Sequence, residues 1–305
     1  QGDHPETLKT VPKLYLPMAI AEEFLRNWGA AAGSSIAIYT SPPEIDTLWE
    51  QNAWVILPFE EAFYRSRGVA ARYVGHPLLD SVKVTANREA FCQKHGINPA
   101  HTLVGLLPGS RQKEIASLLP DFLAAAKCFS GKYEQQFVFL LPVAATISED
   151  DLWKNGLDIY SECIDIHLIH EDRYDMMAAC DVVVAASGTV TLELAILGIP
   201  MVVVYKVSPH TYFIGRLLIR HMQFFSLVNL IAERLVVPEL LQEEVTPGKI
   251  EAALARLLFD EKAGREIRQG LTEVRVKLGN PGASRQAADL AFKLLDRRIQ
   301  PVDGS

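Results

Sequence analysis

From Asp181 to Tyr205 the chain reads DVVVAASGTVTLELAILGIPMVVVY. A β-branched run, a turn of small residues, a helical run and a second β-branched run follow one another in this segment. Glu193, two glycines and Pro200 interrupt its apolar character, which argues against a membrane span. The pattern predicts a strand, a helix and a parallel strand, the repeating unit of an α/β sheet covered by helices on both faces.

The same alternation continues on either side of this segment. We expect strands at 104–107, 137–141, 164–169, 181–185 and 201–205, and helices at 114–129, 172–179 and 190–197. After Pro247 the pattern is helical in three segments, the last ending near Arg298. This order predicts a parallel α/β sheet followed by C-terminal helices.

The first 80 residues contain fewer units of the same kind. We expect helices at 18–32 and 58–67 and strands at 35–39, 54–57 and 72–74. The polar stretch 80–99 is the best candidate for a connection between domains. The sequence therefore predicts an α/β protein with two domains, a short or incomplete one at 1–80 and a larger one at 81–305.

Composition excludes several classes of protein. A length of 305 residues suits two moderate domains, and a net charge of −7 gives no general attraction to nucleic acid or anionic lipid. The four cysteines form no C-x-x-C pair and fit no zinc spacing, so we expect reduced, buried thiols in a cytoplasmic protein. The polar segment 1–13 shows no signal-peptide pattern.

The first motif with chemical potential is Leu-Leu-Pro-Gly-Ser-Arg at 106–111, with Glu114 opening a helix. Gly109 allows close approach of the backbone to a ligand, Ser110 can donate a hydrogen bond, and Arg111 can pair with a phosphate. An ordinary strand-to-helix turn, with Ser110 as the N-cap and Arg111 in solvent, explains the same residues. The motif alone does not decide between these interpretations.

The second motif follows the strand at 181–185 and reads Ala-Ala-Ser-Gly-Thr-Val-Thr-Leu-Glu at 185–193. Ser187, Gly188 and Thr189 would place free N–H groups of a helix N-terminus where a diphosphate can bind. Glu193 lies one turn further on the same helix face and could accept both hydroxyls of a ribose. The alternative is a carboxylate that faces water and interacts with the helix dipole.

Both turns are expected at the carboxyl ends of parallel strands, where open α/β sheets bind ligands. The spacing fits neither a dinucleotide fingerprint nor a P-loop. A third segment, 224–242, carries two amides, Asn229 and Gln242, in apolar surroundings. Read alone, these amides are better explained as buried caps and turns than as ligand contacts.

Taken together, these segments resemble the lipid-A-disaccharide synthase family. The segments that carry the resemblance are Leu57–Glu60, Gly75–Leu78, Leu106–Arg111, Ser187–Glu193, Ser226–Ile231 and Pro238–Gln242. The resemblance covers 53 to about 295 and implies two Rossmann-like domains of the GT-B type. It implies a hexosyltransferase of lipid A and lipopolysaccharide biosynthesis that joins UDP-2,3-diacylglucosamine to 2,3-diacylglucosamine 1-phosphate, releasing UDP.

By this resemblance the C-terminal domain binds the UDP-sugar donor, and the N-terminal domain binds the acceptor. Arg111 would face the diphosphate, with Gly109 and Ser110 in the same turn. Ser187, Gly188 and Thr189 would form the phosphate turn, Glu193 would bind ribose, and Asn229 and Gln242 would contact the donor. No Asp-x-Asp motif occurs, which agrees with transfer without a metal or other cofactor.

The N-terminal part departs from the family. The family's Gly-Glu-x-Ser-Gly-Asp loop and its Asp-x-Pro-x-Phe-Asn segment, which supplies the general base, are both missing. Asp3, Glu44 and Asp46 are the available carboxylates, and none matches, so the catalytic residue stays unassigned. We therefore expect UDP binding with slow or absent sugar transfer. A non-catalytic UDP-sugar-binding remnant and a UDP-sugar epimerase of the same architecture are the alternatives.

Two further features bear on ligands and location. His167 lies on the expected strand 164–169 and His170 just past its end; residues three apart along a strand face opposite sides, which disfavours a metal site. The segment 212–231 interleaves Arg216, Arg220 and His221 with apolar residues. A contact with the inner face of the membrane, which would guide acylated substrates, and a core-packed helix explain that segment equally well.

Overall fold

The computed structural model describes residues 13–15, 37–39, 53–66, 68–206 and 224–299. The chain forms two compact units, one of Gln1–Ser81 with Val276–Ser305 and one of Val82–Arg275. Both units are α/β, with parallel strands throughout the described sheets. The sequence-based division placed all of 81–305 in one domain, whereas the structure groups the residues from Val276 onward with the first unit.

Polar contacts in the first unit explain this grouping. The Tyr73 hydroxyl donates to the carbonyl of Leu278 at 2.8 Å, and the Gly282 N–H donates to the Asp80 carboxylate at 2.7 Å. Gly75 has φ +89°, and a Cβ on it would lie 3.4 Å from the Cβ of Ala283. A polar stretch of sequence gives little sign of such long-range partners, so the division could not be read from it.

The first unit contains two pairs of parallel strands and three described helices. The strands are β1 (Lys13–Tyr15) with β2 (Ala37–Tyr39) and β3 (Ala53–Val55) with β4 (Ala71–Tyr73), and the helices are α2 (Pro58–Arg65), α3 (Leu78–Ser81) and α14 (Ala283–Ile299). A small core of Ala53, Val55, Val69 and Ala71 lies between β3, β4 and their neighbours. β1 was not predicted, and the helix predicted at 18–32 lies outside the described residues.

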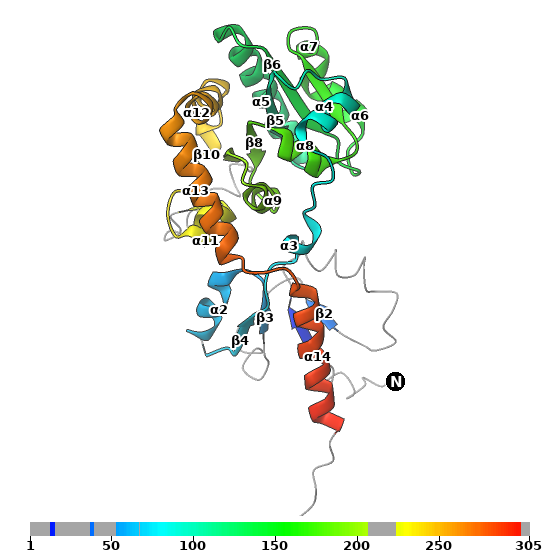
Figure 1. Ribbon diagram of the computed structural model, residues 1–305, viewed down its shortest axis with the longest axis vertical. Helices are drawn as coiled ribbons and strands as arrows, with labels where there is room; N and C mark the ends of the chain where they lie inside the picture. The colour runs from blue at the N-terminus through cyan, green and yellow to red at the C-terminus, as the bar shows by residue number, and fades with distance from the viewer. Residues whose placement is uncertain (1–12, 16–36, 40–52, 67, 207–223, 300–305) are drawn as a thin grey trace, which may run out of the picture. The chain divides into compact units, whose positions relative to one another are not determined.

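The second unit contains one sheet of six parallel strands (Figure 1). They are β5 (Thr102–Leu107), β6 (Phe137–Pro142), β7 (Ile166–Ile169), β8 (Val182–Ala186), β9 (Met201–Tyr205) and β10 (Glu239–Leu241). Their order in the sheet is β10-β9-β8-β5-β6-β7. The prediction of a parallel α/β sheet is therefore confirmed, and the short strand β10 adds to the five predicted strands.

The order of the strands creates one reversal point. The chain builds outward from β5 to β6 and β7, then returns to place β8 against the other side of β5. In this pair Leu106 lies opposite Val184 and Leu107 opposite Ala185. The carboxyl ends of β5 and β8 are therefore neighbours at the reversal point, the position at which open α/β sheets bind ligands.

Helices of the second unit form two packed groups. In one group α5 contacts α12 and both contact the sheet; in the other, α8 and α9 contact each other, α4 packs on α8, and α11 packs on α9. The helices and helical turns are α4 (Arg88–His95), α5 (Gln112–Lys132), α6 (Glu149–Leu152), η3 (Trp153–Leu157), α7 (Asp158–Tyr160), α8 (Arg173–Ala179), α9 (Val190–Leu197), α11 (Leu227–Ala232), η4 (Gln242–Glu244), α12 (Pro247–Phe259) and α13 (Glu261–Lys277).

The helix α4 corrects the expectation that 80–99 is only a connection. Asn87 caps it by accepting the N–H of Ala90 at 2.9 Å, and Gly96 ends it in the left-handed conformation at φ +68°. Both are ordinary helix boundary signals, so the sequence did contain this helix. Just before it, Thr85 donates two hydrogen bonds of 2.6 Å to the buried carboxylate of Asp175 on α8.

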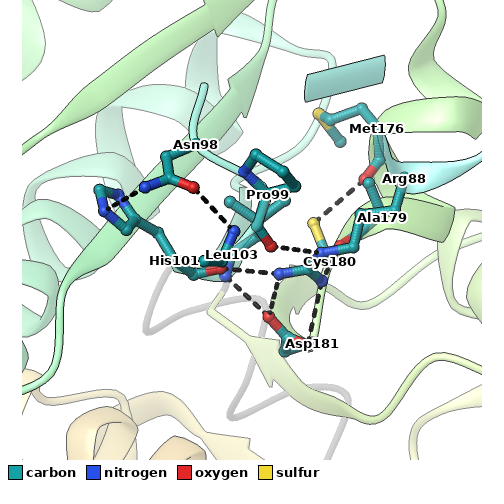
Figure 2. Close-up of polar contacts among 10 residues, drawn as sticks. Arg88, Asn98, Pro99, His101, Leu103, Met176, Ala179, Cys180 and Asp181 are labelled. Carbon is teal, nitrogen blue, oxygen red and sulfur yellow. Dashed lines mark hydrogen bonds and ion pairs between the residues drawn. The ribbon is translucent and has the colours of Figure 1, made fainter. Parts of the chain in front are cut away.

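A polar clamp joins the amino ends of β5 and β8 (Figure 2). Arg88 of α4 pairs with both carboxylate oxygens of Asp181, each at 3.0 Å. The guanidinium also donates to three backbone carbonyls, those of Pro99, His101 and Ala179. Asp181 in turn accepts the N–H of Leu103 at 2.8 Å. One half-buried ion pair thus links the start of both strands at the reversal point.

The cysteines match the expectation in part. Cys92, Cys128, Cys163 and Cys180 are all free thiols, but only Cys92 and Cys180 are buried. The expectation of burial is wrong for Cys128 and Cys163, which are exposed. Cys128 lies on the exposed face of α5, opposite the side of that helix that packs into the core.

In the first unit, His76 is 2% exposed, and its Nδ1 accepts the N–H of Leu78 at 3.2 Å. Burial lowers the pKa of the imidazole from 6.5 to about 4. The folded protein therefore holds a neutral ring that the unfolded chain would protonate below pH 6.5.

We predict that the Arg88→Met variant loses about 1–3 kcal/mol of unfolding free energy, because the pair is half-buried and partly screened by solvent. The substitution removes an ion pair and leaves the Asp181 carboxylate and three carbonyls without their shared donor. Urea denaturation followed by circular dichroism measures the loss. Arg265→Met is the matched control, because Arg265 pairs with Glu261 on the surface, where the side chains are 71% and 87% exposed. Equal effects of the two substitutions would contradict the clamp.

We predict that the first unit loses about 2 kcal/mol of stability between pH 7 and pH 5 through His76 alone. The stability contribution is complete above pH 6.5 and decreases as pH falls toward the folded pKa of about 4, because only the unfolded chain takes up the proton in that interval. Hydrogen exchange of 71–78, corrected for intrinsic rates, measures the change. His76→Gln should show a smaller pH dependence, and an unchanged slope would contradict the assignment.

Candidate functional site

The first predicted turn lies at the carboxyl end of β5. Gly109 has φ +112°, a conformation that favours glycine, and Arg111 is the N-cap residue of α5. The expected helix start at Glu114 is thus two residues late, and the alternative in which Ser110 caps the helix is not observed. The Arg111 side chain is 75% exposed, so its guanidinium is accessible to a ligand.

Glu114 occupies the N–H groups of this turn. Its Oε2 accepts the N–H of Ser110 at 3.0 Å and that of Arg111 at 3.3 Å, while its Oε1 lies 3.2 Å from Nη1 of Arg111. A Cβ at Gly109 would lie 2.3 Å from the same Oε2. A carboxylate of the protein therefore sits where the backbone and Arg111 can hold an anion.

The second predicted turn lies at the carboxyl end of β8. The Ser187 N–H donates to Val204 of β9 at 2.8 Å, and Thr189 is the N-cap residue of α9, the helix predicted at 190–197. The carbonyl of Gly188 accepts the hydroxyl of Thr191 at 2.7 Å. A Cβ added to Gly188 would meet nothing within 4 Å, so open space lies beside this turn.

The alternative in which the Glu193 carboxylate faces water near the helix N-terminus is not observed. Its side chain is 6% exposed, and its Oε1 lies 2.7 Å from Nη2 of Arg173. The Tyr174 hydroxyl lies 3.3 Å from the same oxygen. Arg173 and Tyr174 begin α8, which follows β7, so they enter the neighbourhood of Glu193 from another part of the sequence.

Asn229 lies in the buried interior of the third segment. Its Oδ1 accepts the N–H groups of Val236 and Val237 at 2.7 and 2.9 Å. Its Nδ2 donates to the carbonyl of Val237 at 2.9 Å and to Glu239 at 2.7 Å. These four bonds use the full capacity of a side-chain amide. A direct donor contact by Asn229 would require one of them to break.

Glu239 completes this cluster. Its carboxylate accepts the N–H groups of Phe225 and Ser226 at 2.9 and 2.8 Å, just before α11. The Ser187 hydroxyl donates to the carbonyl of Phe225 at 3.4 Å, which connects the third segment to the second turn. Gln242 follows the carboxyl end of β10 with φ +49°, so it lies at the same edge of the sheet as the two turns.

The structure therefore brings most of the predicted site residues to one edge of one sheet. Gly109, Ser110 and Arg111 follow β5, while Ser187, Gly188 and Thr189 follow its neighbour β8. Sequence reasoning missed Arg173, Tyr174 and Glu239 as partners of this region. Glu114 was named only as a helix opener, although its position three residues after Arg111 fits a capping carboxylate.

The histidines of β7 and its loop have separate partners. His167 lies 3.1 Å from Asp165, and His170 lies 3.2 Å from Glu149. Among the residues that the structure describes, no three His, Cys, Asp or Glu side chains gather as a metal site would require. The two histidines therefore do not converge on one position.

The segment expected at a membrane surface falls partly outside the described residues, since 212–223 are not among them. Over the ranges that are described, no helix is both long enough and apolar enough to cross a bilayer.

The sequence matches known proteins over most of its length. The family described as Lipid-A-disaccharide synthetase matches residues 50–294. The lipid-A-disaccharide synthase of Geobacter sulfurreducens is 39% identical over 250 residues, which are 80% of this chain and 62% of that protein. The corresponding protein of Nitrosococcus oceani is 42% identical over 242 residues, 79% of this chain and 61% of that protein. The chain thus spans about three fifths of the length of these relatives.

Solved structures share the fold at low sequence identity. A UDP-GlcNAc 2-epimerase from Neisseria meningitidis, bound to UDP-GlcNAc, superimposes with a TM-score of 0.56 at 11% identity, covering 93% of this chain and 76% of that one. A glycosyltransferase from Rickettsia africae gives 0.52 at 9% identity, covering 95% and 78%. These likenesses support a GT-B type of fold, and the sequence match adds the family: this chain belongs to the lipid-A-disaccharide synthetase family.

Proposed function

We propose that this chain binds the UDP-sugar donor of a glycosyl transfer in lipid A biosynthesis. The donor would be UDP-2,3-diacylglucosamine, the acceptor 2,3-diacylglucosamine 1-phosphate, and the products the lipid A disaccharide 1-phosphate and UDP. The observation that carries the proposal is the adjacency of the two turns, 109–111 and 187–189, at the carboxyl ends of β5 and β8. Membership of the family supports the identity of the sugars.

The chemistry of the two turns suits a diphosphate. The N-termini of α5 and α9 begin directly after these turns, and a helix N-terminus attracts anions through its N–H groups and dipole. Arg111 adds a mobile cation that can pair with a phosphate oxygen. As UDP departs, negative charge grows on its terminal phosphate. Groups already oriented toward that position would stabilise the transition state more than the substrate.

Glu114 sets the cost of this binding. The Ser110 and Arg111 N–H groups bond to its carboxylate, and Arg111 pairs with it. A diphosphate that uses the same donors must replace this carboxylate, so Glu114 would turn toward solvent on binding. The exchange of one anion for another would keep the turn in the same conformation, because Gly109 holds its positive φ in either case.

The fold alone does not separate transfer from epimerisation, since solved structures of both activities superimpose on this chain. The match to lipid-A-disaccharide synthases over four fifths of the chain favours transfer. The carboxylates considered for the general base, Asp3, Glu44 and Asp46, lie outside the described residues.

We predict that UDP binds and that AMP at equal concentration does not. At a hundredfold excess over its dissociation constant, UDP should raise the unfolding free energy by about 2.7 kcal/mol, measured as a selective rise in melting temperature. Arg111→Ala should weaken UDP binding by roughly 1.5–3 kcal/mol in titration calorimetry, the usual loss for a charge-assisted hydrogen bond. The lower end is expected, because Arg111 must leave Glu114 to bind the phosphate.

Uridine is the control ligand, because it carries no phosphate for Arg111 to bind. Its affinity should change little in Arg111→Ala, whereas equal losses for uridine and UDP would assign Arg111 to the fold. Arg111→Lys should recover part of the UDP affinity, since a point charge cannot reproduce the guanidinium fork. The absence of any selective stabilisation by UDP in the unmodified protein would overturn the donor proposal.

A further inference from the structure

The ion pair between Arg173 and Glu193 links two helices that neighbour each other at the sheet. Arg173 is the first residue of α8, and Glu193 lies in the first turn of α9. Nη2 of Arg173 lies 2.7 Å from Oε1 of Glu193, and the Glu193 side chain is 6% exposed against 56% for Arg173. A carboxylate buried to this degree needs a charged or hydrogen-bonding partner to stay ionised.

Local chemistry does not explain an arginine at this position. A cation in the first turn of a helix opposes the helix dipole, whose N-terminal end is positive. The residue before it, Asp172, has φ +59°, in the left-handed region, which Asp adopts more often than most residues other than glycine. Lys94 of α4 pairs with Asp172. A residue that opposes a local preference, as this arginine does, and whose partner comes from another element, is typical of a functional position.

Tyr174 supports the same arrangement. Nη2 of Arg173 donates to the Tyr174 hydroxyl at 2.6 Å, and the guanidinium carbon lies 4.6 Å from the centre of the Tyr174 ring. The Tyr174 hydroxyl lies 3.3 Å from Oε1 of Glu193. Two adjacent side chains of α8 therefore hold one oxygen of the carboxylate. Their segment follows the carboxyl end of β7, so it lies at the same edge of the sheet as the two phosphate-type turns.

We propose that Arg173 is a positioning residue that keeps Glu193 ionised and oriented so that its carboxylate accepts a hydrogen bond from the ribose 2′-hydroxyl of UDP. This inference rests on the proposed donor function. An ionised carboxylate accepts hydrogen bonds at both oxygens, whereas a neutral acid offers one acceptor fewer and adds a donor. Arg173 thereby makes the site selective for a ribonucleotide over a 2′-deoxyribonucleotide, without touching the nucleotide itself.

The test compares UDP with 2′-deoxy-UDP by titration calorimetry. The unmodified protein should bind UDP at least about tenfold more tightly, the typical worth of a hydrogen bond to a charged group. Arg173→Gln should reduce this ratio to about threefold or less, while the affinity for 2′-deoxy-UDP changes by less than about threefold. Arg173→Lys should restore part of the ratio, because it restores the charge but not the planar fork.

A double-mutant cycle separates positioning from independent effects. Glu193→Gln should lower the ratio as far as Arg173→Gln, and the double variant should lower it no further, because both act through one carboxylate. Arg265→Gln is the matched control; its exposed pair with Glu261 lies on α13, and the ratio should stay at its original value. Additive losses in the double variant would contradict the inference.

The remaining results of these binding measurements separate failure of the inference from failure of the proposed function. An unchanged ratio in Arg173→Gln, or equal losses for both nucleotides, overturns the inference and leaves the proposed function standing. Binding of UDP without ribose discrimination by the unmodified protein does the same. If the unmodified protein does not bind UDP, the proposed function fails as well. If Arg173→Gln does not fold, Tyr174→Phe decides, since it removes only the hydroxyl near Oε1; it should lower the ratio, and an unchanged ratio overturns the inference.

Discussion

The alignment of β5 with β8 is the constraint on which the site depends, and the Arg88–Asp181 ion pair fixes it from the opposite end of the strands. Asp181 accepts the Leu103 N–H and donates its own N–H to the Leu103 carbonyl, so the two strands start in one register. A slip of one residue would move one turn by about 3.3 Å along the sheet and reverse which side chains face the core. The turns 109–111 and 187–189 stay adjacent because the Arg88–Asp181 clamp at the opposite ends of the strands holds the strands in register.

The second unit was largely readable from the sequence because its signals are local and strong. The segment 181–205 has two β-branched runs around one helix, and the observed α9 and β9 begin and end at the predicted residues. The short strand β10 was not predicted, since three residues carry almost no periodicity. The helix α4 was not predicted because its polar composition resembles that of a linker, although Asn87 caps it and Gly96 ends it.

The candidate site was predictable only in part, for a similar reason. Turns that follow strands, such as 109–111 and 187–189, can be recognised in the sequence, because glycine and other small residues come directly after an apolar run. Arg173 has no such signal, because its partner Glu193 is twenty residues away and is reached through the packing of two helices. Asn229 shows the converse: its buried amide was read as a ligand contact by resemblance, yet its bonds close a loop within the protein.

The segment from Val276 onward belongs to the first unit, and this has a consequence for the order in which the two units are completed during synthesis. The second unit, Val82–Arg275, is continuous in sequence. All of its residues are therefore synthesised before the ribosome reaches the segment from Val276 onward. The first unit instead draws on residues from both sides of that block, including the Leu278 carbonyl and the Gly282 N–H. The early strands of the first unit, β1 to β4, therefore precede the second unit in synthesis, whereas the segment from Val276 onward follows it. We therefore expect that the second unit can fold before all segments of the first unit have been synthesised.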